Sequence, residues 1–273
     1  MNRIFATTLL QLAVYLALLN VTPPAPRVFT QSQWDLNRHV LESYVLGGST
    51  VQTVFVGSSL TQRVEFPDDP FSVRNLALSG DSAFSGLATI LATSHRPKRV
   101  FVEINVLDRD VNLTIIESTT GLLPRLSKIF QTKNSPANFI LSQLGRVHLQ
   151  ARSDILNESV FQKLLDVNVA EHSIPLNTDL LNQRIQNYQK MISEISQRGA
   201  KVVFFEMPVN PAVANSPRAR QIREAVQKGF PSHLCIEGAA LASGLEIRTQ
   251  DGIHLSIREV ESLVPRLREL YLP

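Results

Sequence analysis

Short apolar runs and longer amphipathic segments alternate along most of this chain. Five runs have the length and composition of strands: Val51 to Val56, Ser72 to Leu78, Arg99 to Val106, Lys201 to Met207 and Leu245 to Arg248. Segments with helical spacing separate them: about Gln31 to Leu46, Ala83 to Ser94, Asn177 to Arg198, Pro217 to Lys228 and Ser256 to Leu270. Strands that alternate with helices predict an α/β fold built on a doubly wound, mostly parallel sheet.

The segment from Asn177 to Arg198 shows the helical spacing most clearly. Its apolar residues step by four, three, four and three positions, which places them on one face: Leu181, Ile185, Tyr188, Ile192 and Ile195. Asn177 or Thr178 is suited to cap the start, and Gly199 is suited to end the helix.

The first residues form a separate apolar segment. Ile4 to Val21 contains no charged residue, and a helix of this length reaches roughly 27 Å, close to the hydrocarbon thickness of a bilayer. We predict an uncleaved signal anchor. A cleaved signal peptide and a buried core helix are the alternatives. Arg3 precedes the segment, and the positive-inside bias then puts Arg3 in the cytoplasm and the rest of the chain outside it, periplasmic or at the cell surface, or secreted if the segment is cleaved.

These features divide the chain into two parts. Residues 1–26 comprise the apolar segment and a stiff Pro-rich spacer, Pro23 to Pro26. Residues 27–273 form the globular domain. Within it, about 112–173 fits the strand and helix alternation poorly, and we interpret it as an insertion over one end of the sheet, where it would shape a substrate pocket.

Composition and charge exclude several classes of function. The net charge is only +3 and the basic residues are scattered, which argues against nucleic-acid binding. The single cysteine, Cys235, excludes an intramolecular disulfide and a thiolate metal cluster, and its apolar context is typical of a small core residue. The six histidines show no metal-ligand spacing, so we expect neither a metal nor another cofactor.

Polar residues suited to acyl chemistry follow the predicted strands. Gly57-Ser58-Ser59 comes directly after the first strand, and Ser79-Gly80-Asp81 comes after the second. Because open parallel sheets bind ligands at the carboxyl ends of their strands, we expect these turns to border one site. Asp251 stands three residues ahead of His254, where a carboxylate can orient an imidazole.

These residues resemble the blocks of the SGNH (GDSL-type) hydrolase family, over most of residues 50–260. Gly57-Ser58-Ser59-Leu60-Thr61 is similar to the Gly-Asp-Ser-Leu-Thr block, with Ser58 in place of Asp, and Asn75 to Ser82 is similar to the second block. Asp251-Gly-Ile-His254 is similar to the Asp-x-x-His block. The resemblance implies a flavodoxin-like three-layer sandwich.

The resemblance also implies roles for the matching residues. Ser59 is the expected nucleophile, His254 the general base and Asp251 its partner. Gly80 and the Ser59 backbone N–H are the expected oxyanion-hole donors. Ser58 as the nucleophile is an alternative.

The third block departs from the Gly-x-Asn-Asp pattern of the family. The chain has Glu103-Ile104-Asn105-Val106, which keeps Asn105 at the oxyanion asparagine but places Glu103 at the usual glycine. An alternative register, aligned on Asp108, puts Leu107 at the asparagine and loses the amide. We favour the first register and expect Glu103, within its strand, to face a local polar partner.

Three functions are compatible with this set of residues. The first is a serine esterase that acts through an acyl-enzyme on an acyl or acetyl ester outside the cytoplasm. The second is an O-acyltransferase for cell-surface polysaccharide, with an acylated glycan as substrate and a membrane acyltransferase as partner, as the resemblance implies for anchored members. The apolar segment and the altered third block both favour it. The third is a non-catalytic binding module with a vestigial triad, which the altered third block favours.

Overall fold

The computed structural model describes residues 2–22, 28–47, 51–66, 72–121, 130–148 and 157–271, with only the backbone described at residues 2, 3 and 145–148. The predicted spacer, Pro23 to Pro26, lies outside the described residues.

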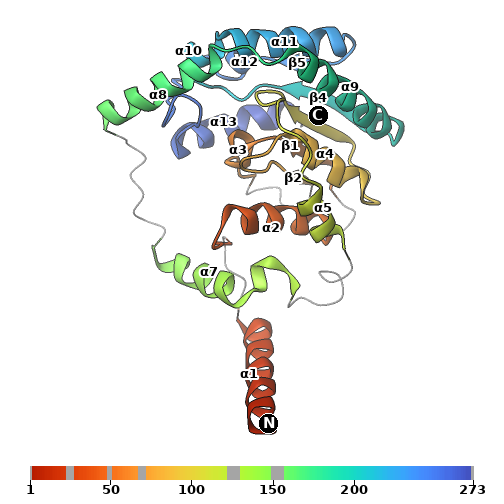
Figure 1. The fold of residues 1–273 in the computed structure, drawn as a ribbon, viewed down its shortest axis with the longest axis vertical. Coiled ribbons are helices and arrows are strands. Elements are labelled where there is room, and N and C mark those ends of the chain that lie inside the picture. Colours follow the sequence, from red (N-terminus) through yellow and green to blue (C-terminus); the bar gives the residue numbers. More distant parts are fainter. Residues whose placement is uncertain are drawn as a thin grey trace.

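A five-stranded parallel sheet forms the centre of the domain (Figure 1). Its strands lie in the order β2-β1-β3-β4-β5. Their bounds are Val73–Asn75 for β2, Thr53–Val56 for β1, Arg99–Glu103 for β3, Lys201–Phe205 for β4 and Cys235–Ile236 for β5. Every pairing between neighbours is parallel. This order is that of flavodoxin-like folds, and it confirms the predicted doubly wound α/β architecture.

Side chains that alternate along the strands enter two separate cores. Val54, Val100 and Val202 point into one core, together with apolar residues of helices α2, α4, α9 and α11. Phe55, Phe101 and Val203 point into the other, which α13 covers with Leu263 and Leu267 among others. Because both faces of the sheet are buried, the central residues of β1, β3 and β4 are continuously apolar.

Five helices occupy the segments in which helices were predicted. Their bounds are Gln33–Val45 for α2, Ala83–Leu91 for α4, Thr178–Gln197 for α9, Pro217–Gly229 for α11 and Ile257–Glu269 for α13. In α9 the side chain of Asn177 accepts a hydrogen bond from the N–H of Leu180, and the five residues of the predicted apolar face are all buried. Gly199 follows the helix with a φ of 94°.

The prediction of a strand from Leu245 to Arg248 is wrong. That segment has no strand structure, and it leads into an isolated antiparallel bridge between Thr249 and Leu255. The fifth strand is instead β5, which pairs with Phe204 and Phe205. Two residues are too few to show a hydrophobic period, so β5 left no recognisable pattern in the sequence.

Cys235, expected in the core, lies in β5. Its side chain is half-buried against the core that contains Val54. Burial raises the pKa of its thiol to about 11, which keeps the thiol protonated and unreactive at neutral pH.

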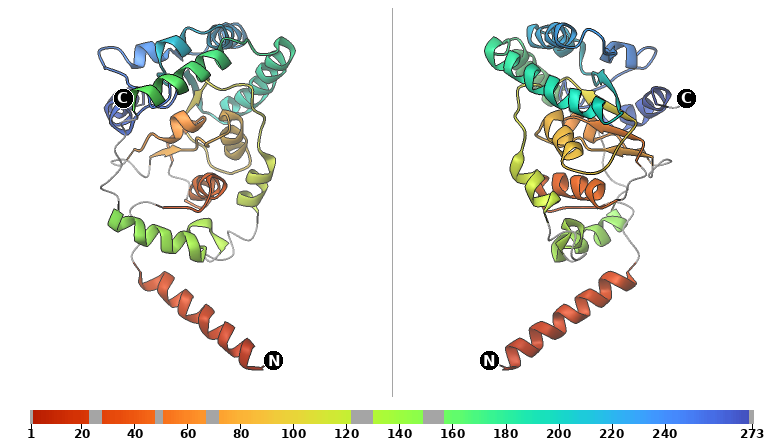
Figure 2. Two further views of the ribbon diagram at one scale, coloured as in Figure 1. Left: turned by 60° about the vertical axis from the view of Figure 1, so that its left-hand side comes forward. Right: turned by 90° about the vertical axis from the view of Figure 1, so that its right-hand side faces the viewer.

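The described residues between 112 and 173 form separate helices at two places in the molecule. The helix α5 (Leu113–Thr120) packs against α2 and α4, and α7 (Pro136–His148) follows the short helix η2 (Thr132–Asn134). In contrast, α8 (Glu158–His172) contacts α10 (Pro211–Ala214) and α11. The views of Figures 1 and 2 show α7 next to the N-terminal helix and α8 at the far end of the domain.

The N-terminal helix α1 (Asn2–Val21) projects away from the domain (Figure 1). Its window Ile4–Val21 has a mean hydropathy of 1.9, and no residue of this window is fully buried. The alternative of a buried core helix is therefore wrong. The helix is long and apolar enough to cross a membrane.

Candidate active site

The turn after β1 presents two serines in different surroundings. Ser58 is 1% exposed and caps the short helix α3 (Ser59–Gln62), accepting a hydrogen bond from the N–H of Leu60. Its hydroxyl donates to Glu103 at 2.6 Å. Ser59, the first residue of α3, is only partly buried and faces away from that interaction. The turn thus buries one hydroxyl and leaves the other at the surface of a pocket.

The buried carboxylate of Glu103 holds this turn in place through hydrogen bonds. It ends β3 and is 1% exposed. Its carboxylate accepts hydrogen bonds from the N–H and hydroxyl groups of both Ser58 and Thr61, at 2.6 to 3.2 Å. A buried carboxylate is tolerated only when it is hydrogen-bonded in this way, so Glu103 and the serine turn form one interlocked unit.

The absence of a side chain at Gly57 makes room for that carboxylate. A Cβ at position 57 would lie 2.4 Å from Oε2 of Glu103 and 2.7 Å from its Cβ. The buried carboxylate of Glu103 therefore packs directly against Gly57.

A second tight turn, just ahead of α13, carries the imidazole. Oδ1 of Asp251 accepts hydrogen bonds from the N–H groups of Ile253 and His254, a local closure typical of aspartate in turns. Gly252 has a φ of 94°, which other residues rarely adopt, and a Cβ there would lie 2.6 Å from Leu165 of α8. The side chain of Ser256 then caps α13.

The two turns meet through a chain of hydrogen bonds. The Ser59 Oγ lies 2.8 Å from Nε2 of His254, and Nδ1 of His254 lies 2.7 Å from Oδ2 of Asp251. Burial by itself raises the pKa of Asp251, but hydrogen bonds from the His254 side chain and from two backbone N–H groups outweigh it and lower this pKa to about 2. An ionised Asp251 accepts a hydrogen bond from the Nδ1–H group of His254, which leaves the Nε2 lone pair free to accept a hydrogen bond from the Ser59 hydroxyl.

Residues outside the three-residue chain hold the two turns together. Arg63, which ends α3, donates to the carbonyl of Leu255 at 2.8 Å and to the side chain of Gln250 at 2.9 Å. From α8, the side chain of Asn168 donates to the carbonyl of Asp251 at 2.8 Å. Arg63 thus links the turn that contains Ser59 (the serine turn) to the turn that contains His254 (the histidine turn), and Asn168 ties the histidine turn to α8.

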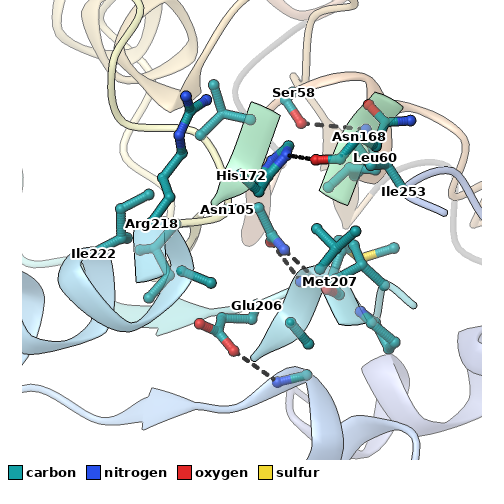
Figure 3. Close-up of a pocket in the computed structure, with 18 of the residues that line it drawn as sticks. Ser58, Leu60, Asn105, Asn168, His172, Glu206, Met207, Arg218, Ile222 and Ile253 are labelled. Carbon is teal, nitrogen blue, oxygen red and sulfur yellow. Dashed lines mark hydrogen bonds between the residues drawn. The ribbon is translucent and has the colours of Figure 1, made fainter. Parts of the chain in front are cut away.

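Asn105 and Leu107, which the two registers of the third block place at the position of the asparagine, lie in different surroundings. Asn105 lines the same pocket as Ser59 and His254. Its carbonyl oxygen accepts from the N–H of Met207 at 2.7 Å, and its amide donates to the carbonyl of Met207 at 3.0 Å (Figure 3). One of the two amide protons remains available. Leu107 is 1% exposed and belongs to the core.

Gly80 lies in an exposed turn with a φ of 75°. It is not among the residues that line the pocket; the amide of Gln33 lies beside it and donates to the carbonyl of Ser79. Within the described residues, the backbone N–H groups of Ser59 and Gly80 have no hydrogen-bond acceptor in the protein, whereas those of Ser58, Leu60 and Thr61 do.

A pocket of about 650 Å³ opens beside Ser59 and His254. Its apolar wall comes from the end of β4 and from the helices beyond it, and includes Met207, Val213 and Ile222 (Figure 3). Asn168, Glu171 and His172 of α8 form another part of the wall. Of the segment 112–173, which was expected to shape a pocket, the helix α8 contributes residues to the pocket wall.

Several residues of the site escaped the sequence analysis. The sequence did not indicate that Glu103 accepts hydrogen bonds from Ser58 and Thr61, that Arg63 donates to Leu255, or that Asn168 donates to Asp251. Each of these hydrogen bonds joins residues more than 40 positions apart. Glu206 had a weak signal, as a charged residue ending an apolar strand; it is buried and pairs with Arg223 at 2.6 Å. In the described part of the chain no group of three or more His, Cys, Asp or Glu residues is placed to hold a metal ion.

Comparison with known proteins adds a distant structural likeness. No protein-family model matches the chain, and no curated protein matches it by sequence. Among solved structures, the crystal structure of TesA is similar over 80% of this chain and 96% of the TesA chain, with 14% sequence identity and a TM-score of 0.36. This likeness is too distant to carry a functional argument, which therefore rests on the residues of the chain itself.

Proposed function

We propose that the protein is a serine ester hydrolase of the SGNH type, which acts through an acyl-enzyme on an ester outside the cytoplasm. The observation that carries the proposal is the continuous hydrogen-bond chain from Ser59 through His254 to Asp251 at the wall of a pocket. A nucleophile, a base and a group that orients the base are the three parts that such catalysis needs.

In the first half of the proposed reaction, Ser59 Oγ attacks the ester carbonyl while His254 Nε2 accepts the hydroxyl proton. The resulting tetrahedral oxyanion collapses as the bond from the acyl carbon to the alcohol oxygen breaks. His254 returns the proton to the departing alcohol, and the acyl group remains on Ser59. Asp251, ionised because its pKa is about 2, stabilises the imidazolium throughout.

In the second half, water enters and His254 takes a proton from it. The hydroxide equivalent attacks the acyl-enzyme, and collapse of the second tetrahedral intermediate releases the acid and returns the proton to Ser59. In both halves the oxyanion is held by the N–H group of Ser59 and by the remaining amide proton of Asn105; Gly80, the other expected donor, does not line the pocket, so we leave it out of the proposed oxyanion hole. Each such donor contributes a factor of about 10² to 10³ to the rate.

The size of the pocket supports a substrate larger than an acetyl ester of a small alcohol. Pockets of about 300 to 1,000 Å³ hold drug-sized molecules, and this one has a volume of about 650 Å³ with an apolar part that includes Met207, Val213 and Ile222. The apolar helix α1 and the preceding Arg3 support an extracytoplasmic site.

An O-acyltransferase uses the same acyl-enzyme and differs only in the second acceptor, a sugar hydroxyl in place of water. The apolar helix α1 favours this second candidate, because it would hold the domain near membrane-bound carriers. Product analysis distinguishes the two: acyl groups that accumulate on an added glycan indicate transfer, and free acid alone indicates hydrolysis. The non-catalytic alternative is disfavoured by the intact Ser59–His254–Asp251 chain.

Labelling with a fluorophosphonate probe tests the proposal. We expect a covalent adduct on Ser59 in the full-length protein, and loss of that adduct in both Ser59→Ala and His254→Ala variants. Ser58→Ala is the matched control, because the Ser58 hydroxyl binds Glu103 and not His254. An adduct on Ser58, or no adduct on folded protein, contradicts the proposal.

A further inference from the structure

The helix α7 has its polar and apolar residues on the sides opposite to those of an ordinary surface helix. Asn138 is 1% exposed and Ser142 is 4% exposed, whereas Ile140, Leu141 and Leu144 are 56%, 37% and 56% exposed. Phe130, just ahead of η2, is 46% exposed. A surface helix of a water-soluble domain normally turns its apolar residues inward, so this arrangement needs an apolar partner outside the domain.

The buried polar residues explain why the helix is held in this orientation. Oδ1 of Asn138 accepts from the N–H of Gln31, and Oγ of Ser142 accepts from the N–H of Phe29, both at 2.9 Å. Asn138 also donates to the carbonyl of Thr132 at 3.0 Å. Because these bonds satisfy backbone groups of the segment 28–31, rotating α7 to bury its leucines would leave those groups without partners.

The helix α7 and the residues just before it contact α1. Tyr15 of α1 donates a hydrogen bond from its hydroxyl to the carbonyl of Asn134, and its ring meets the edge of Phe139 with the centroids 6.0 Å apart. Figures 1 and 2 show α7 at the end of the domain from which α1 projects. The helix that carries the exposed apolar residues is thus in contact with a helix that is apolar enough to cross a membrane.

We propose that α7, with Phe130, Ile140, Leu141 and Leu144, lies in the lipid–water interface of the bilayer that α1 enters. Tyr15 stands six residues before Val21, the last residue of α1, which is about 9 Å along the helix axis. Interfacial helices insert their apolar face about 5 to 10 Å into the boundary between headgroups and acyl chains, so the contact at Tyr15 lies at the depth that the proposal requires.

The residues beside the exposed apolar face of α7 also favour a lipid surface as its partner. Lys133, between Phe130 and α7, is exposed and can approach lipid phosphates, and Tyr15 is of a residue type enriched at the membrane interface. The interface would fix the domain at the bilayer with α8 and the candidate pocket at its far end (Figure 1). The proposal depends on α1 entering a bilayer and is independent of the chemistry at Ser59.

Fluorescence quenching in vesicles tests the proposal. The full-length protein, carrying Cys235→Ala, is reconstituted into vesicles of equal parts phosphatidylcholine and phosphatidylglycerol, with and without brominated acyl chains. A polarity-sensitive fluorophore is attached to Ile140→Cys or Leu144→Cys. The matched control is Leu234→Cys, since Leu234 is also 56% exposed but lies beside β5, away from α7. Leu10→Cys in α1 reports the membrane segment itself.

We expect blue-shifted emission and quenching by brominated lipid at positions 10, 140 and 144, and neither effect at position 234. Quenching at position 10 without quenching at 140 and 144 overturns the proposal. So does the absence of quenching at all four positions, because α1 is then outside the bilayer. Energy transfer between differently labelled copies at position 140, without quenching, would instead assign the face to a second copy of the chain.

Discussion

At the scale of single residues, the candidate site depends on how buried carboxylates are satisfied. Glu103 accepts from four donors of the serine turn, and Asp251 accepts from His254 and two backbone N–H groups. The first carboxylate fixes where the Ser59 hydroxyl stands, and the second fixes which nitrogen of His254 faces it. Both roles require an oxygen that only accepts hydrogen bonds.

Replacement of Glu103 tests its role in positioning Ser59. In Glu103→Gln one acceptor oxygen becomes an NH₂ donor that opposes the donors of Ser58 and Thr61, and we expect a loss of stability of about 1 to 3 kcal/mol. We also expect slower fluorophosphonate labelling of Ser59 under conditions in which the variant remains folded. Glu42→Gln is the matched control, because Glu42 is 2% exposed and accepts from the N–H and hydroxyl of Thr132, away from the site. If both variants label at equal rates, Glu103 has only a structural role.

The depressed pKa of Asp251 predicts a pH-dependent stability. Because its pKa in the folded protein is about 2, against 3.8 for the ordinary value, the folded state is stabilised above pH 3.8, and this stabilisation is lost as the pH falls through about 2. It amounts to at most about 2 kcal/mol, less what water screens from the quarter of the side chain that is exposed. In urea denaturation, the difference in the free energy of unfolding between the wild type and Asp251→Asn should become smaller below pH 4. A difference that is constant with pH contradicts the assignment.

At the scale of elements, α8 combines weak burial with close contact to the triad. It contains no buried residue, yet Asn168 donates to the carbonyl of Asp251 and Leu165 packs on Gly252. An element held by few buried groups opens more easily than the core of a domain. We therefore expect the position of the histidine turn to depend on how stably α8 packs against the rest of the domain.

Asn168→Ala tests this dependence. Loss of the hydrogen bond to Asp251 should destabilise the packing of α8 against the domain by about 0.5 to 1.5 kcal/mol. It should also lower kcat/KM by up to about tenfold. Gln162→Ala is the control on the same helix, since Gln162 is exposed and bonds only Asp166 within α8. Steady-state kinetics of the two variants should differ, and equal values would show that α8 does not support the triad.

At the scale of the whole molecule, the parallel sheet brings the site together. The strands β1, β3 and β4 end at one edge, where Ser59, Asn105 and Met207 follow them. The pocket extends from this edge under α8, α10 and α11. Under the proposed function, the volume of the pocket and the apolar part of its wall, rather than Ser59, His254 and Asp251, would decide which acyl groups enter.

The pocket predicts a preference for longer acyl chains. For a series of p-nitrophenyl esters, each methylene that enters the apolar wall should contribute about 0.8 kcal/mol, or roughly a fourfold gain in kcat/KM, until the wall is filled. Ile222→Gln, in the apolar wall, should flatten this dependence, whereas Val160→Gln, an exposed position of α8 outside the pocket lining, should not. A steady fall in kcat/KM beyond the acetyl ester would contradict the prediction.

The amino-acid sequence by itself determined the features that depend on neighbouring residues. The apolar face of α9, the caps at Asn177 and Ser256 and the glycine turns after the strands are local, because periodicity and capping act within a few residues. Alternating strands and helices were enough to predict the parallel sheet. The strand expected at Leu245 to Arg248 was wrong, and β5 was missed, because a two-residue strand has no period of its own.

Only the tertiary structure decided which distant groups meet. Ser59 and His254 are 195 positions apart, and no local rule brings them to 2.8 Å. The partners of Glu103, the brace from Arg63 and the separation of α7 from α8 likewise depend on strand order and on packing against both faces of the sheet. Local free energies set the elements, whereas burial of the two cores sets their positions, and the candidate site exists only where those positions coincide.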